Sequence, residues 1–138
     1  MEELSTERLE GLLFRSGFAE YRKRCPPEPG FAGYYLELLS QKGLSRSRAI
    51  TGSGLEVHYG YQLLNGRKQP GRDKVLCLCI GGGFSIEETN RALEWASHSR
   101  LYAKRPRDAA VMLCLNQGMD AVWKVNALLA EYGLPLLS

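Results

Sequence analysis

Apolar residues recur every three or four positions along most of the chain, the spacing that places side chains on one face of an α-helix. The segment at about residues 73–80 is apolar on every side, which predicts a buried helix, whereas the segment at about 5–21 carries a narrower apolar stripe. The pattern therefore predicts an all-α fold. Helices are expected at about residues 5–21, 31–41, 45–53, 56–64, 73–80, 85–97, 105–117 and 119–132.

Residues with special backbone preferences mark the ends of these segments. Ser45 and Ser85 are candidate N-caps, because a serine hydroxyl can accept a hydrogen bond from an unpaired amide of the first helical turn. Gly54 suits a tight corner, since glycine enters a left-handed turn without a side-chain clash. The glycine triplet at 81–83 could cradle a phosphate, but it follows a helix and lacks a Lys-Ser/Thr partner, so a helix-ending turn is the favoured interpretation.

The C-terminal half contains a faint internal repeat of two helical hairpins. Such a hairpin either stacks on its predecessor or offers a face to another subunit. A shift of 36 residues superposes Pro70 on Pro106, Val75 on Val111, Gly82 on Gly118, Ile86 on Val122, Asn90 on Asn126 and Leu93 on Leu129.

Composition is that of an ordinary globular domain, with 138 residues, 44% hydrophobic and 24% charged. No apolar run approaches the roughly 20 residues that a membrane span needs. The first seven residues also lack the basic-then-apolar order of a secretion signal. We therefore expect a cytoplasmic protein with no membrane partner.

Basic residues are concentrated in the middle of the chain. The net charge is only +3, but residues 41–74 hold seven basic residues and two acids, whereas residues 1–20 hold five glutamates and two arginines. A basic triplet at 22–24 precedes a proline-rich run and is expected in a linker. There it is either solvated charge, the commoner case, or an arm that touches a phosphate backbone.

The sequence offers no recognisable catalytic or metal-binding set. Cys25, Cys77, Cys79 and Cys114 show no metal-ligand spacing and are expected to be small buried thiols. The two histidines have no companions that would complete a Ser/His/Asp or Cys/His catalytic set. The sequence also has no phosphate-binding loop. We expect no cofactor and no metal, and an enzyme is the least favoured class of function.

The stretch from Leu44 to Gly66 is the part of the chain that points to a function. It reads Leu-Ser-Arg-Ser-Arg-Ala-Ile-Thr-Gly-Ser-Gly-Leu-Glu-Val-His-Tyr-Gly-Tyr-Gln-Leu-Leu-Asn-Gly, two short helices with a tight turn between them. Together with its continuation, Arg-Lys-Gln-Pro-Gly-Arg-Asp-Lys-Val-Leu, it resembles the Cro/repressor-type helix-turn-helix of the xenobiotic-response-element regulator family. The most specific part is the Leu-Leu-Asn-Gly-Arg-Lys-x-Pro end of the second helix.

The resemblance covers about residues 33–96 and implies a lambda-repressor-like bundle of five helices. On this basis residues 1–30 form an N-terminal helix and Pro-rich linker, 31–98 the DNA-binding domain, and 99–138 a C-terminal helical hairpin. Two positions depart from the family. Ile50 stands where a small alanine is usual, and Gly60 stands where Ile or Val is usual. Tyr59 or Leu63 is expected to take over the buried role, and the ring of Tyr59 or Tyr61 is expected to fill the hole left by the glycine.

The resemblance implies that the second helix enters the major groove of B-DNA, which admits one α-helix. Gln62 can bind adenine with two hydrogen bonds, and His58 can donate or accept at a purine, although a lone histidine is more often an ordinary surface residue. Base-edge contacts are expected from Val57, His58, Tyr59, Tyr61 and Gln62. Phosphate contacts are expected from Ser45, Arg46, Ser47, Asn65, Arg67, Lys68 and Arg72.

Three classes of function compete on this sequence, of which an enzyme is the least favoured. The favoured one is a sequence-specific regulator of transcription that binds double-stranded DNA as a homodimer, because one such unit contacts too few bases. The second is a helical protein–protein interaction module without DNA binding, favoured by the long C-terminal hairpin and by the departures at Ile50 and Gly60. The C-terminal hairpin or the N-terminal helix is expected to form the dimer seam or the surface for a protein partner.

Overall fold

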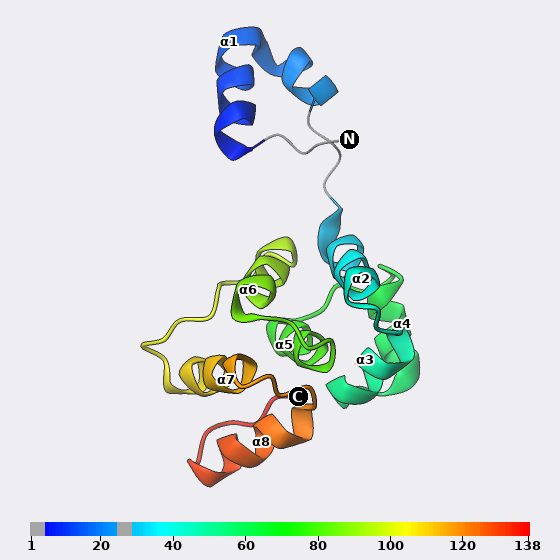
Figure 1. The fold of residues 1–138 in the computed structure, drawn as a ribbon, viewed down its shortest axis with the longest axis vertical. Coiled ribbons are helices and arrows are strands. Elements are labelled where there is room, and N and C mark those ends of the chain that lie inside the picture. The colour runs from blue at the N-terminus through cyan, green and yellow to red at the C-terminus, as the bar shows by residue number, and fades with distance from the viewer. Residues whose placement is uncertain (1–4, 25–28) are drawn as a thin grey trace.

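The computed structural model describes residues 5–24 and 29–138, and all regular structure in these ranges is helical (Figure 1). The all-α prediction is confirmed for this part of the chain, which contains eight helices and no strand. The helices are α1 (Thr6–Arg24), α2 (Gly30–Lys42), α3 (Arg46–Ser53), α4 (Val57–Leu64), α5 (Arg72–Gly81), α6 (Ile86–Trp95), α7 (Pro106–Asn116) and α8 (Val122–Glu131).

Helix α1 stands apart from the helical body in Figure 1 and has no buried residue. It is bent at Gly17, where φ is 83°. The prediction that the basic triplet 22–24 belongs to a linker is wrong, because these residues form the last turn of α1. Cationic side chains are favoured at the negative end of the helix dipole, and Lys23 also pairs with Glu20 at 3.3 Å. Most of the predicted Pro-rich linker, residues 25–28, lies outside the described residues.

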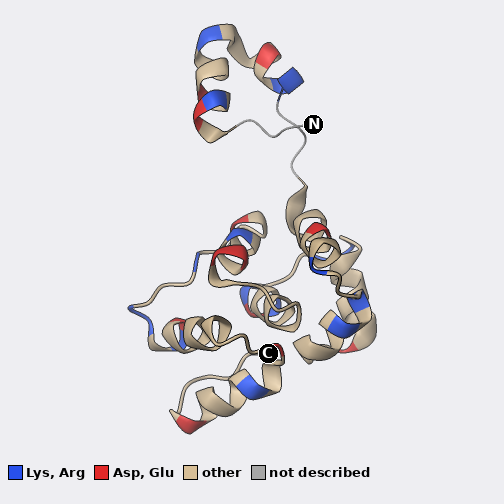
Figure 2. Ribbon diagram, in the orientation of Figure 1, with Lys and Arg blue, Asp and Glu red and all other residues tan. Residues whose placement is uncertain are grey.

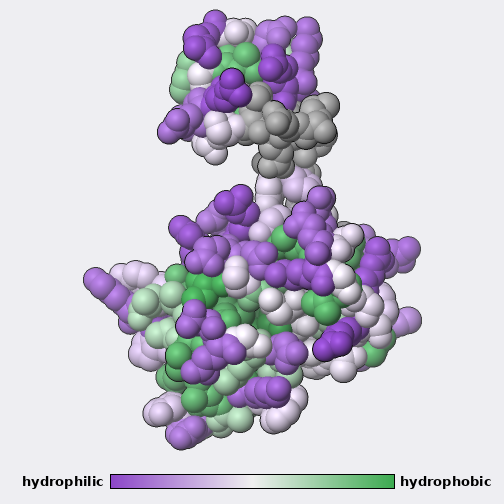
Figure 3. Space-filling view, viewed as in Figure 1, coloured by the Kyte–Doolittle hydropathy of each residue, from purple (hydrophilic) through white to green (hydrophobic). Residues whose placement is uncertain are grey.

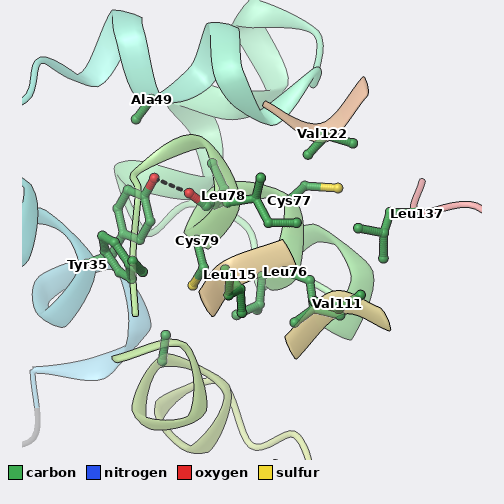
Figure 4. Packing of buried hydrophobic residues seen from close by; sticks show 14 of the residues in the cluster. Tyr35, Ala49, Leu76, Cys77, Leu78, Cys79, Val111, Leu115, Val122 and Leu137 are labelled. Carbon is green, nitrogen blue, oxygen red and sulfur yellow. Dashed lines mark hydrogen bonds between the residues drawn. The ribbon is translucent and has the colours of Figure 1, made fainter. Parts of the chain in front are cut away.

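Helix α5 lies at the centre of the body formed by α2 to α8 (Figures 1 and 4). Residues 75–80 are each at most 1% exposed, as expected for a segment that is apolar on every side. Helices α3, α6 and α8 pack against it. The hydroxyl of Tyr35 in α2 donates a 2.6 Å hydrogen bond to the Leu78 carbonyl, which gives a buried phenol its partner.

The backbones of α3 and α5 touch at two glycines. A Cβ atom on Gly52 would lie 2.9 Å from the Cα atom of Gly81, and one on Gly81 would collide with the carbonyl oxygen of Ala49. Only hydrogen atoms fit in this crossing, because protein interiors are close-packed. The contact therefore holds α3, and with it the start of α4, at a fixed depth against the buried helix.

Gly60 of α4 faces Ile50 of α3. A Cβ atom on Gly60 would lie 2.8 Å from Cγ2 of Ile50, a side chain that is 1% exposed. The large residue on α3 thus occupies the space left by the small residue on α4, and the two residues compensate each other in volume. The expectation that a tyrosine ring fills this space is wrong, because the three atoms nearest to such a Cβ all belong to Ile50. Leu63, the other residue expected to take the buried role, is fully buried.

The internal repeat is present in the structure, with a change of register that the sequence comparison missed. Gly83 after α5 and Gly118 after α7 both have positive φ, and these two glycines are 35 residues apart, not 36. The turn to α6 then has two residues and the turn to α8 has three, which restores the shift of 36 for the second helices. We call residues 72–102 the first repeat and residues 107–138 the second repeat.

Two reciprocal ion pairs join the repeats. Arg72 binds Asp108 through two hydrogen bonds of 3.0 and 2.9 Å, and Arg107 binds Asp73 through two of 2.9 and 2.7 Å. Each arginine also donates to two carbonyls of the terminal segment of its own repeat. These carbonyls belong to Ser99 and Arg100 for Arg72, and to Pro135 and Leu136 for Arg107.

Candidate nucleic-acid interface

Helices α3 and α4 are each started by a side-chain cap. As predicted, Ser45 caps α3, where its Oγ accepts a 3.1 Å hydrogen bond from the Arg48 amide, and Gly54 turns the corner with φ of 69°. The Glu56 carboxylate caps α4 by accepting from the amides of His58 and Tyr59 at 2.9 and 2.8 Å. These two hydrogen bonds hold the pKa of Glu56 below its usual value.

The side of α4 opposite its buried residues carries His58 and Gln62. Gly60, Leu63 and Leu64 face the core, and His58 is exposed; Val57, in the first turn, is 59% exposed. Gln62 is half-buried and lies one helical turn after His58 on the side opposite the buried residues. By exposure, the base-contacting candidates therefore divide into Val57 and His58, which are exposed, and Tyr59, Tyr61 and Gln62, which are half-buried.

Exposed basic residues occur in the chain both before and after α4 (Figure 2). Arg46 and Arg48 lie in the first turn of α3, and Arg67 and Lys68 follow α4. None of the four forms an ion pair with another residue in the described ranges. The remaining phosphate candidates in these two segments, Ser45, Ser47 and Asn65, are also exposed.

Tyr59 lies between two lysines. The Nζ atoms of Lys68 and Lys74 are 5.5 and 5.6 Å from the centre of its ring, within the range of a cation–π contact. Lys74 was not among the predicted site residues. Its charge is visible in the sequence, but only the packing of α5 against the α3–α4 pair places it beside Tyr59. The ring thus lies beside a local concentration of positive charge.

Arg72, predicted to contact a phosphate, is occupied within the protein. Four of the five N–H groups of its guanidinium donate to Asp108 and to the carbonyls of Ser99 and Arg100. Lys42 likewise pairs with Glu88 at 2.9 Å. Of the seven basic residues at 41–74, five are thus left without an ion pair in the described ranges, namely Arg46, Arg48, Arg67, Lys68 and Lys74.

His98 lies far from α4 in the sequence but holds the segment between α4 and α5. Its Nε2 is 2.9 Å from the carbonyl oxygen of Pro70. Pro70 is buried and closes the exposed stretch at 65–69. The segment that carries Arg67 and Lys68 is therefore held at its C-terminal end by a side chain that follows α6.

The described residues contain no group of His, Cys, Asp or Glu side chains arranged to hold a metal ion. Cys77, Cys79 and Cys114 are buried free thiols, and burial raises the pKa of Cys77 to about 11. Within the same residues, no helix combines the length and apolar character needed to cross a bilayer. Comparison with protein-family models, curated proteins and solved structures finds no match to this chain.

Proposed function

We propose that this chain is a sequence-specific regulator of transcription that binds double-stranded DNA, with α4 in the major groove. The observation that carries the proposal is the side of α4 that bears His58 and Gln62, flanked in the chain by Arg46, Arg48, Arg67 and Lys68. An α-helix with accessible hydrogen-bonding side chains on one face fits the major groove, and flanking cations suit the two phosphate backbones.

The proposal includes the finer fold assignment. Helices α2 to α6 would form the five-helix, lambda-repressor-like unit, with α3 and α4 as its helix-turn-helix. The compensating pair Ile50 and Gly60 supports this, because it preserves the packing between these two helices with the large and small residues exchanged. Residues 99–138 would then be an appended hairpin that extends the bundle.

Each solvent-accessible side chain of this surface has a distinct role in the proposal. His58 and Gln62 would read base edges, and Val57 would contact a thymine methyl group. Ser45, Arg46, Ser47, Asn65, Arg67 and Lys68 would bind phosphates. Tyr59, placed between Lys68 and Lys74, would lie against the DNA backbone and not against a base.

The test is selection of a duplex from a random library with the full-length chain, followed by fluorescence anisotropy of the enriched duplex at about 50 to 200 mM salt. We expect one enriched sequence whose affinity falls steeply with salt, because phosphate binding releases counterions. Failure to enrich any duplex, or an affinity that does not depend on salt, would exclude the proposal.

Variants separate the two kinds of contact. Replacing Arg67 and Lys68 with Ala should weaken binding to all duplexes alike and lower the salt slope by about two. Gln62→Ala should cost about 1–3 kcal/mol at one base position and relax specificity there. The charge-matched control replaces Arg91 and Lys104, two exposed cations outside this surface, and should bind as the unmodified chain does.

A second candidate function, a protein–protein interaction module, is favoured by apolar surface on the C-terminal hairpin. Leu113, Trp123 and Tyr132 are 49%, 71% and 69% exposed. Figure 3 shows hydrophobic surface over the region where Figure 1 places α7 and α8. Under the first proposal this surface would form the homodimer seam. A complex with a protein partner that survives the Arg67 and Lys68 substitutions, in a chain that binds no DNA, would favour the second.

A further inference from the structure

The segment between α6 and α7 forms the wall of an open pocket of about 440 Å³. This volume lies within the range of small-molecule sites. The pocket is separate from the surface around α4, because none of its lining residues belongs to α3, α4 or the stretch between α4 and α5. Its lining residues are Asn90, Ser99, Arg100, Leu101, Tyr102 and Arg105.

Asn90 supplies a hydrogen-bond donor at this pocket that the protein itself leaves unused. The residue is only 7% exposed, and its Oδ1 accepts a 2.8 Å hydrogen bond from the Leu101 amide. Its Nδ2 donates to no acceptor within the described part of the chain. A buried amide normally finds a partner, so an unused donor in a pocket wall indicates that the partner is solvent or a ligand.

The second repeat shows that the unused donor is a local feature and not a property of the repeat. Asn126 occupies the equivalent position, and its Oδ1 accepts from the Leu137 amide at 2.8 Å. There, however, Nδ2 also donates to the Leu137 carbonyl at 3.2 Å, so both ends of the amide are satisfied within the protein. The same arrangement in the first repeat leaves its donor free at the pocket.

Two arginines line the same pocket. Arg100 and Arg105 are both exposed, and Figure 2 shows basic residues along this segment. The acids near them leave this charge available. Glu94 pairs with Arg100 at 3.2 Å, but the two side chains are 56% and 65% exposed and such a pair contributes little. Asp108 lies near Arg105, but its carboxylate is bound by Arg72 and by the Tyr102 amide.

From this combination we propose that the pocket binds a small molecule through an oxyanion group, a phosphate or a carboxylate. The Asn90 Nδ2 group donates one hydrogen bond, and Arg100 and Arg105 supply the positive charge and further donors. Hydrogen bonds from guanidinium groups to oxyanions are short and strong, and they can be bidentate. The oxyanion would displace Glu94 from Arg100.

The first test is a titration of the ¹⁵N-labelled full chain with inorganic phosphate and, in a second arm, with citrate, at constant ionic strength set by chloride. We expect saturable shifts at the Asn90 side-chain amide and at the amides of Leu101 and Tyr102. Saturation by phosphate alone identifies a phosphate-bearing ligand, and saturation by citrate alone identifies a carboxylate. Shifts that chloride reproduces, or that do not saturate with either probe, overturn the proposal.

Variants test whether these side chains form the site. Arg100→Gln and Arg105→Gln should each weaken binding of the effective probe about tenfold, the effect of losing one charge-assisted hydrogen bond. Lys104→Gln is the matched control, because it removes the same charge from the same segment at a residue that does not line the pocket. An equal loss in the control, or no loss in either arginine variant, means general charge attraction and overturns the proposal. Thermal unfolding of each variant shows whether it is folded.

Discussion

The two repeats share their polar contacts and differ in their surroundings. In both, an arginine binds two carbonyls of its own terminal segment and an aspartate of the other repeat. In both, an asparagine of the second helix accepts a hydrogen bond from an amide 11 residues later. The first helices differ, since α5 is buried along residues 75–81 whereas in α7 only Asp108, Val111, Cys114 and Leu115 are buried.

This difference shows that the polar contacts and the apolar residues of the repeats have separate structural roles. The shared polar residues are directional and fix how each hairpin closes and how the repeats meet. The apolar and glycine content of the first helix decides how deep the hairpin lies. Helix α5 ends in Gly81 and is crossed closely by α3, but the equivalent residue of α7 is Asn116, which is exposed. The same set of polar contacts thus occurs in a central hairpin and in a peripheral one.

The largest effect is expected when the glycine that distinguishes the two first helices is replaced. Gly81→Ala should lower the free energy of unfolding by about 3 kcal/mol, because its Cβ collides with backbone that cannot move independently. Asn116→Ala, at the equivalent exposed position, should change it by less than about 0.5 kcal/mol. Urea unfolding of both variants measures the two values. Similar losses would show that the close crossing of α3 and α5 does not distinguish the repeats.

The next effect concerns the reciprocal ion pairs, which are equivalent in geometry but not in burial. The side chain of Asp108 is 5% exposed and that of Asp73 is 28% exposed. Asp108→Ala should therefore cost about 3 kcal/mol, since it leaves Arg72 and the Tyr102 amide without their acceptor in a buried place. Asp73→Ala should cost about 1 kcal/mol.

Urea unfolding again measures both, and a double-mutant cycle with Arg72 isolates the buried pair. In Asp108→Asn the shape is kept and the charge is removed, so this variant separates lost charge from lost packing. Equal costs at positions 73 and 108 would mean that burial does not set the strength of these pairs.

Structural features that depend on residues close together in the sequence were predictable. The caps at Ser45 and Ser85, the corner at Gly54 and the burial of residues 75–80 all follow from local chemistry or from periodicity. The capping box at Ser85 is completed by Glu88, whose carboxylate accepts from the Ser85 amide at 2.9 Å. These signals are short-range, so one sequence is enough to recognise them.

Features that depend on how helices cross were not predictable. The sequence did not show that Arg72 is bound by Asp108, because the two residues are 36 positions apart, so Arg72 was expected to be free for a phosphate. Lys74 was overlooked because its neighbour Tyr59 lies on another helix. One sequence signal could have helped. The dipeptide Arg-Asp occurs at 72–73 and again at 107–108, 35 residues later, and a one-residue change of register in the repeat would have aligned them.

Acid should weaken the contacts between the repeats. Partial burial alone would raise the pKa of both aspartates, but hydrogen bonds hold each pKa below its usual value. Asp73 accepts hydrogen bonds from Arg107 and the Ser138 amide. Asp108 accepts hydrogen bonds from Arg72 and the Tyr102 amide. A lowered folded-state pKa contributes stability that is present above the unfolded-state pKa of about 3.9 and is lost as pH falls through the folded-state value.

We therefore expect the thermal unfolding midpoint to be steady from neutral pH to about pH 5 and to fall below about pH 4. A variant with Asn at both 73 and 108 should start lower and fall less. Its decline should not vanish, because the pKa of Glu88 is also lowered, by the Ser85 amide and by Lys42 acting against partial burial. If the unfolding midpoints of the variant and the unmodified chain fell in parallel with pH, the aspartates would not be the cause of the loss of stability in acid.

The smallest effect concerns the start of the second helix in each repeat. The N-cap of α6 is Ser85, which forms a full capping box, whereas the N-cap of α8 is Ala121, whose methyl group cannot accept a hydrogen bond. The backbone of Ala121 is extended, with φ of −140° and ψ of 129°, the conformation in which a serine N-cap functions.

Ser85→Ala should therefore destabilise the protein by about 1 kcal/mol, and Ala121→Ser should stabilise it by about 0.5 kcal/mol. Chemical unfolding of the two variants and of their combination measures both changes, which should add because the positions share no partner. Ala121→Gly is the control for backbone effects. If serine at 121 gave no more stability than glycine, the missing cap would not be what distinguishes the peripheral hairpin at this position, and the difference between the repeats would lie in their apolar contacts alone.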